Sequence, residues 1–145
     1  MNDTESSQPV PPSSRVAACA CGALRLTVAG APLRVHACAC RQCQIASGTA
    51  FTYTAFYPET ALLTCEGEYR TFRRVARSGN WQEGCFCPTC GGNVFSRHQG
   101  WPGVVGIAVG CFGDASFDKP RELLWCSERH EWLGVPGGVR EVQRQ

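Results

Sequence analysis

The sequence predicts a mostly antiparallel all-β domain, and three observations favour it. Val, Thr, Phe, Tyr and Trp are common, whereas long runs of the strong helix formers Ala, Leu, Glu and Lys are absent. Sixteen glycines and nine prolines interrupt the chain throughout, as turns between short strands require. Several segments alternate apolar and polar residues, which is the period of a half-buried strand. With 145 residues, 43% of them hydrophobic, the chain is long enough for one domain with its own core.

The expected elements follow from these patterns in chain order. Alternation, or a run of β-branched and aromatic residues, predicts strands over 23–29, 33–38, 49–57, 104–112 and 123–126. Residues 41–47 predict one short helical turn that ends at Gly48. Residues 62–72 predict a hairpin around Glu66-Gly67-Glu68.

The two ends of the chain set the expected domain boundaries. Residues 1–14 are polar and rich in Pro and Ser, without the apolar stretch of a signal peptide, and predict a disordered tail. The polar end, 137–145, is expected to be loose, which leaves one domain over 15–136. The most apolar later run, 101–112, is too short to span a membrane. We therefore expect a soluble, cytoplasmic protein.

Charge argues against a nucleic-acid partner. The net charge is +2, and thirteen arginines accompany a single lysine, Lys119. A basic set made mostly of arginine favours fixed contacts with carboxylates or phosphates over general polycation behaviour.

Eleven cysteines are the unusual feature of the composition. An odd number does not close a disulfide framework, and clustered cysteines in a reducing compartment are more typical of metal binding. Seven of them fall into three tight groups: Cys19 with Cys21, Cys38 with Cys40 and Cys43, and Cys87 with Cys90. In C-x-x-C the chain turns so that both sulfurs converge, and in an extended C-x-C the two residues share a face.

These groups predict one closed and one open metal site. A tetrahedral zinc site needs four ligands, which Cys19, Cys21, Cys87 and Cys90 supply as a structural site. The remaining group supplies three sulfurs, which is the pattern of a catalytic zinc with one free position. A substrate thiol entering that position would be held as thiolate, so a thiol is the expected substrate class.

Alternatives remain open for the cysteines. The C-x-x-C at Cys87 is also compatible with a redox dithiol. Cys65, Cys85 or Cys111 is a possible fourth ligand beside the group of three, and Cys85 would point the same way as Cys87 on a strand. Cys126, like these three, is otherwise a small buried hydrophobe.

The combined motifs resemble the glutathione-dependent formaldehyde-activating enzyme family, which also contains centromere protein V. The motifs are CACG at Cys19, CACRQCQIASG at Cys38, Ser78-Gly79, FCPTCGG at Phe86, Pro120, and R-x-x-W at Arg129 and Trp132. The resemblance implies a β-tent fold with two zinc ions. It implies structural zinc on Cys19, Cys21, Cys87 and Cys90, and catalytic zinc on Cys38, Cys40 and Cys43.

The activity that the resemblance implies is the joining of glutathione and formaldehyde to S-hydroxymethylglutathione, a carbon–sulfur lyase in the reverse sense. Arg41, inside the metal motif, is the expected contact for a glutathione carboxylate, and Arg70, Arg73, Arg74 and Arg77 are further candidates. His36 shares the face of Cys38 and is a candidate ligand or proton shuttle. The competing classes are a zinc-stabilised binding module without catalysis and a thiol-based redox protein.

Overall fold

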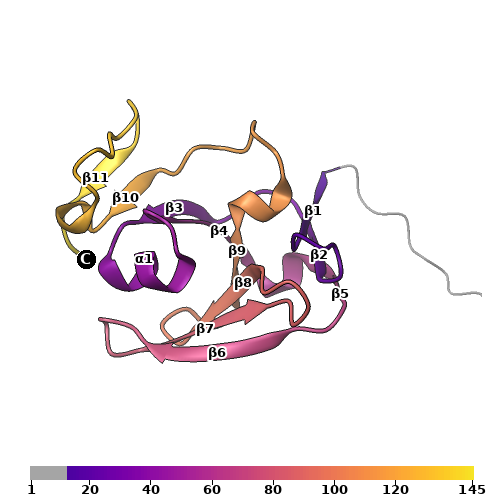
Figure 1. Ribbon diagram of the computed structural model, residues 1–145. Helices are drawn as coiled ribbons and strands as arrows, with labels where there is room; N and C mark the ends of the chain where they lie inside the picture. The colour runs from indigo at the N-terminus through magenta and orange to yellow at the C-terminus, as the bar shows by residue number, and fades with distance from the viewer. Residues whose placement is uncertain (1–12) are drawn as a thin grey trace, which may run out of the picture.

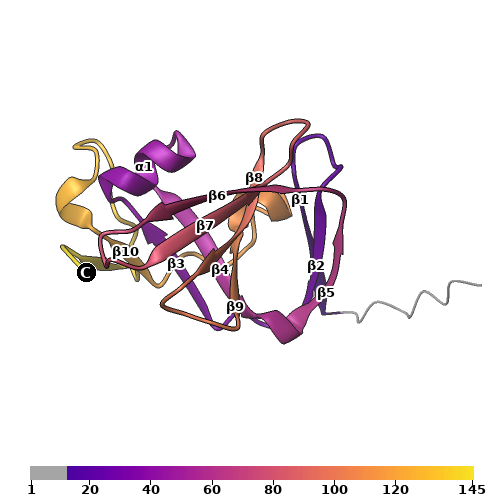
Figure 2. The ribbon, with the colours of Figure 1, turned by 90° about the horizontal axis from the view of Figure 1, so that it is seen from below.

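The strands form two sheets in the computed structural model, which describes residues 13–145 (Figures 1 and 2). The smaller sheet has the strand order β1-β2-β5 and the larger has the order β11-β10-β3-β4-β9-β8-β7-β6. The strands are β1 Ser14–Ala18, β2 Arg25–Ala29, β3 Arg34–Cys38, β4 Thr52–Pro58, β5 Leu62–Glu66, β6 Arg70–Val75, β7 Trp81–Phe86, β8 Asn93–His98, β9 Val104–Ala108, β10 Glu122–Leu124 and β11 Arg140–Val142. The helical segments are α1 Arg41–Ser47, η1 Glu59–Ala61, η2 Val109–Phe112 and η3 Cys126–Glu128.

The predicted fold class is confirmed. Every strand pair is antiparallel except those of β10, which runs parallel to β3 and to β11. Figures 1 and 2 both place the small sheet at one end of the large sheet, with α1, β10 and β11 at the other. The helix α1 ends as the sequence predicts, because Gly48 adopts φ +65° as its C-cap.

The predicted hairpin over 62–72 is wrong. The strand β5 pairs with β2 in the small sheet, whereas β6 pairs with β7 in the large one. Gly67 lies where the chain passes between the sheets, with φ +91°. A Cβ atom on Gly67 would lie 1.9 Å from the Ala23 carbonyl oxygen, so glycine here serves a close backbone approach rather than a hairpin turn.

Three further expectations change at the ends of elements. The predicted strand over 104–112 ends at Ala108, and η2 follows it. The segment 137–145, expected to be loose, contains β11, which pairs with β10. Of the predicted tail, residues 1–12 lie outside the described residues, and Ser14 already belongs to β1.

The two faces of the large sheet differ in character. One face packs against the small sheet, and Val35, Tyr57, Phe95 and Ile107 are buried there with residues of β1 and β2. The opposite face, which we call the polar face, carries side chains that alternate with these core residues. By strand register it bears Arg34, His36, Cys38, Thr54, Phe56, Arg74, Gln82, Ser96 and His98. The polar face is where the large sheet presents functional groups. Among the described residues, we find no helix with the length and apolar character needed to cross a bilayer.

Candidate metal centres

Four sulfurs converge where the small sheet meets the large one. Cys19 and Cys21 lie in the turn after β1, and Cys87 and Cys90 lie in the turn after β7. All four sulfurs lie within 4.8 Å of one another. The Cys19–Cys21 and Cys21–Cys87 sulfur pairs are 3.6 Å and 3.7 Å apart. Four sulfurs at 2.3 Å from a tetrahedral ion lie about 3.8 Å apart, so these four fit a zinc-type site. We call them the closed cluster.

Two similar turns build the closed cluster. In the first, the Cys19 amide donates to the Leu24 carbonyl and the Gly22 amide donates to the Cys19 carbonyl, both at 3.0 Å. In the second, Cys87 and Gly92 are joined in the same way at 3.0 Å. The Leu24 amide donates to the Cys19 sulfur at 3.3 Å and lowers the pKa of Cys19 to about 6. Backbone amides thus favour the thiolate, which is the form that binds a metal.

The second group of sulfurs lies at the opposite end of the large sheet. Cys38 ends β3, Cys40 is the N-cap of α1, and Cys43 lies in the first turn of α1. Their sulfurs lie within 4.8 Å of one another, and all three residues are buried against Leu124. We call them the open cluster.

The open cluster is electrostatically biased toward one thiolate. Hydrogen bonding from the Cys38 thiol, and then from Cys40 and Thr52, lowers the pKa of Cys43 to about 5, and the positive charge of Arg74 acts in the same direction. The Arg74 guanidinium donates to the Cys43 sulfur at 3.8 Å and to the Gln42 side chain at 3.1 Å. The hydrogen bond with Cys43, followed by burial, raises the pKa of Cys38. The Arg74 guanidinium beside Cys43 therefore favours a thiolate at that position.

No fourth His, Cys, Asp or Glu among residues 13–145 joins the open cluster. Cys85 was the main alternative, but it is fully buried in the core on the other side of the large sheet. Cys111 donates to the Asn93 carbonyl at 3.5 Å, and Cys126 donates to the Leu123 carbonyl at 3.1 Å. Cys65 lies exposed on β5. None of these four cysteines therefore joins Cys38, Cys40 and Cys43, and the group keeps the three sulfurs that the sequence predicts.

The polar face beside the open cluster carries a hydrogen-bonded histidine that the sequence analysis did not single out. The two ring nitrogens of His98 bond to Gln82 at 2.9 Å and to Ser96 at 3.0 Å. Burial, and then the charge of Arg74, lowers the pKa of His98. Its ring contacts Phe56 with centroids 5.5 Å apart. Alternation along β7 and β8 is the signal that would have placed Gln82, Ser96 and His98 on one face.

His36 lies on the same face, between Cys38 and Arg34. Its ring is edge-on to Phe56 at 4.7 Å, and its Nδ1 atom is buried without a hydrogen-bond partner among the described residues. Burial, followed by the charges of Arg34 and His98, lowers its pKa to about 4. It is not within reach of the three sulfurs as a joint ligand set.

Arg41 lies at the first turn of α1, with its side chain exposed. Its backbone amide donates to the Glu128 carboxylate at 2.6 Å. The same carboxylate pairs with Arg77 at 2.6 Å, and Arg77 lies over the Trp125 ring at 4.3 Å. This network ties η3 to α1 beside the open cluster. Of the arginines proposed from the sequence, Arg74 is the one that reaches a cluster sulfur.

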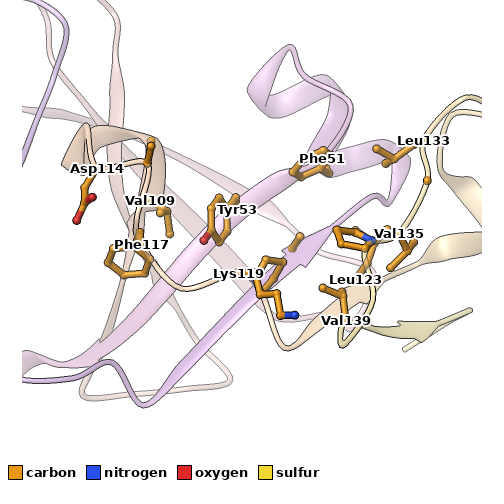
Figure 3. A pocket seen from close by; sticks show the side chains of 16 residues that line it. Phe51, Tyr53, Val109, Asp114, Phe117, Lys119, Leu123, Leu133, Val135 and Val139 are labelled. Carbon is orange, nitrogen blue, oxygen red and sulfur yellow. The ribbon is translucent and has the colours of Figure 1, made fainter.

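A separate apolar cavity of about 520 Å³ lies on the other face of β3 and β4 (Figure 3). Ala37 and Tyr53 line it, and these residues alternate with Cys38 and Thr52. Figure 3 shows Phe117 beside Tyr53 at one end, and Leu133 and Val135 at the other. The sheet separates this cavity from the open cluster, so the cavity does not lead to the sulfurs.

Fold and clusters together define a two-sheet β protein whose cysteines can hold two metal ions. The family model of the glutathione-dependent formaldehyde-activating enzymes matches residues 14–128, and the chain belongs to that family. Its fold is similar to a crystal structure of a protein from Rhodobacter sphaeroides, with a TM-score of 0.50 and 23% sequence identity. The match covers 73% of this chain and 92% of that one. No match was found among the curated proteins.

Proposed function

We propose that this protein is a zinc-dependent enzyme of the carbon–sulfur lyase type that acts on a thiol–aldehyde adduct. The family description names glutathione and formaldehyde, which makes S-hydroxymethylglutathione the first adduct to test. The observation that carries the proposal is the open cluster, where three buried sulfurs converge and no fourth side chain among residues 13–145 completes the set.

Each cluster supplies a different kind of metal site. Cys19, Cys21, Cys87 and Cys90 would hold a structural Zn²⁺, and Cys38, Cys40 and Cys43 would hold a catalytic one. A Zn²⁺ ion in the open cluster would lower the pKa of a substrate thiol so that it is held as thiolate.

The reaction itself needs few groups from the chain. A bond forms between the thiol sulfur and the aldehyde carbon, and the thiol proton ends on the former carbonyl oxygen. The chain's part is to hold the two reactants together, since proximity is a large share of catalysis in such additions. Arg74, at 3.8 Å from the Cys43 sulfur, offsets negative charge where the thiolate would lie. His98 is held in place on the neighbouring part of the polar face by Gln82 and Ser96.

The test is an NMR measurement of how fast free glutathione and ¹³C-formaldehyde exchange with their adduct. The metal content of each protein is measured first. The wild-type protein should raise the exchange rate above the uncatalysed rate, and Cys40→Ser should return it to the uncatalysed rate. Cys65→Ser is the matched control, because Cys65 is an exposed cysteine outside both clusters and should leave the rate unchanged.

Two outcomes would count against the enzyme. A wild-type protein that holds two zinc ions and does not raise the rate would be a metal-stabilised binding module instead. A zinc-free protein whose Cys87 and Cys90 form a reducible disulfide would be a redox protein.

A further inference from the structure

A second cleft opens at the other end of β3 from the open cluster. It has a volume of about 650 Å³. Its lining consists of Leu33, Arg34, Trp101, Arg121, Glu122 and Arg140, which we call the arginine cleft. Three of these six residues carry a guanidinium group and one carries a carboxylate, so the lining has an excess of two positive charges.

A buried carboxylate organises the arginine cleft. Only 5% of the Glu122 side chain is exposed, and its two oxygens pair with different arginines, Oε1 with Arg34 and Oε2 with Arg140. A buried carboxylate needs such partners, because an unpaired charge in the interior is costly. Glu122 therefore holds two guanidinium groups in fixed positions at the edge of the cleft.

Arg121 has no ion-pair partner among residues 13–145. Its backbone is fixed on both sides, because its amide donates to the Val35 carbonyl at 3.0 Å and its carbonyl accepts from the Arg140 amide at 2.9 Å. Its side chain is exposed. The cleft lining thus includes one arginine that no carboxylate among residues 13–145 neutralises.

Two residues of the arginine cleft, Arg34 and Glu122, lie on the same face of the sheet as Cys38 of the open cluster. Arg34, His36 and Cys38 alternate along β3 on the polar face, and Glu122 and Leu124 of β10 pair with the last two in parallel register. Four residues of strand place the Cα atoms of Arg34 and Cys38 about 13 Å apart. Phe56 of β4 pairs with Arg34 beside the cleft, and its ring lies 4.7 Å from that of His36 and 5.1 Å from that of Trp101.

We propose that the arginine cleft binds a carboxylate of the thiol substrate while its sulfur lies at the open cluster, with Arg121 as the main contact. The inference rests on the proposed function. Planar, forked guanidinium groups match a carboxylate by paired hydrogen bonds. In glutathione the γ-glutamyl carboxylate lies about eight bonds, or about 10 Å when extended, from the sulfur. The difference between this length and the distance of about 13 Å along β3 is shorter than an arginine side chain. The aromatic surface of Phe56 and Trp101 would carry the apolar part of the ligand.

Binding can be measured without turnover. S-Methylglutathione keeps both carboxylates but has a thioether in place of the thiol, so it cannot ligate a metal as thiolate. Titrated into the full-length protein, it should shift the amide NMR signals of Arg34, Arg121 and Arg140 and the indole signal of Trp101. Its dimethyl ester, which lacks the carboxylate charges, should leave these signals in place.

Arg121→Gln should weaken S-methylglutathione binding about tenfold, because it removes a charged hydrogen bond. It leaves both ion pairs of Glu122 intact. Substitution of Arg34 or Arg140 would instead remove one partner of the buried Glu122 carboxylate. Arg25→Gln is the matched control, since Arg25 is an exposed arginine of β2 in the other sheet. It should bind as the wild type does. In turnover, Arg121→Gln should raise KM for glutathione and leave the rate with 2-mercaptoethanol unchanged.

The outcomes separate this inference from the proposed function. Glutathione turnover with no shift at the arginine cleft and an unchanged KM in Arg121→Gln would overturn the inference alone. Binding of S-methylglutathione at the cleft without any turnover of glutathione would overturn the proposed enzyme activity, while the carboxylate-binding site would stand. Acetate or inorganic phosphate that binds the cleft as tightly as S-methylglutathione would show a general anion site and overturn its assignment to the substrate.

Discussion

A Cys21→Ser/Cys90→Ser double substitution removes one sulfur from each of the two segments that meet in the closed cluster. Both residues are exposed, so the substitutions themselves leave the core intact. Cys19 and Cys87 stay in place, but two thiolates hold zinc far more weakly than four. The expected result is a protein with one zinc ion instead of two and with lower thermal stability.

The magnitude follows from the length of chain that the closed cluster closes. Cys21 and Cys87 are 66 residues apart. A cross-link that closes a loop of this length stabilises the folded state by about 4 kcal/mol, through the entropy of the unfolded chain. For a domain of this size, about 4 kcal/mol corresponds to a fall in Tm of roughly 12–16 °C. The open cluster closes only the few residues from Cys38 to Cys43, for which the same relation gives about 2 kcal/mol.

Thermal melting followed by circular dichroism, with zinc counted by elemental analysis, checks this prediction. Cys65→Ser is the control and should melt with the wild type and keep both ions. Loss of one ion with a Tm within about 3 °C of wild type would refute the view that the closed cluster ties the two sheets together. Retention of two ions would refute the assignment of its ligands.

Two further predictions concern the interior and pH. Tyr57→Phe removes a hydroxyl that is buried without a hydrogen-bond partner among the described residues, so urea unfolding should show a gain of about 1–3 kcal/mol, and a loss would contradict it. Burial and then Arg74 lower the pKa of His98, so the folded state takes up its proton later than the unfolded state does. Stability that is present above about pH 6.5 should therefore be lost as pH falls below it. The variant His98→Gln should show a flatter fall between pH 6.5 and 5 in the same assay, and an unchanged slope would exclude His98 as its source.

The cysteine motifs and the strand pattern were readable from the sequence for local reasons. Spacings such as C-x-C and C-x-x-C act over a few residues, and the turn that brings their sulfurs together depends on nearby backbone. Gly22 and Gly91, for example, adopt φ of +78° and +75° inside the two turns of the closed cluster. Alternation likewise located β2, β3 and β4, because the side-chain period of a strand is local.

Pairing between strands could not be read in this way. The segments of β5 and β6 are adjacent in the chain, yet they belong to different sheets, and their partners β2 and β7 lie elsewhere in the sequence. Alternation did predict that Cys85 and Cys87 point the same way, and both are buried in one core. That this core lies on the face opposite Cys38 follows only from the pairing of β7, β8, β9 and β4.

The sequence by itself therefore determined an all-β domain and two sets of cysteines with metal-ligand spacing, since both are properties of short segments. Only the tertiary structure decided that no fourth His, Cys, Asp or Glu among 13–145 joins Cys38, Cys40 and Cys43, and that Arg74 reaches the Cys43 sulfur. These relations join residues far apart in the chain. They depend on strand register, where a shift of one residue moves every side chain to the opposite face of the sheet.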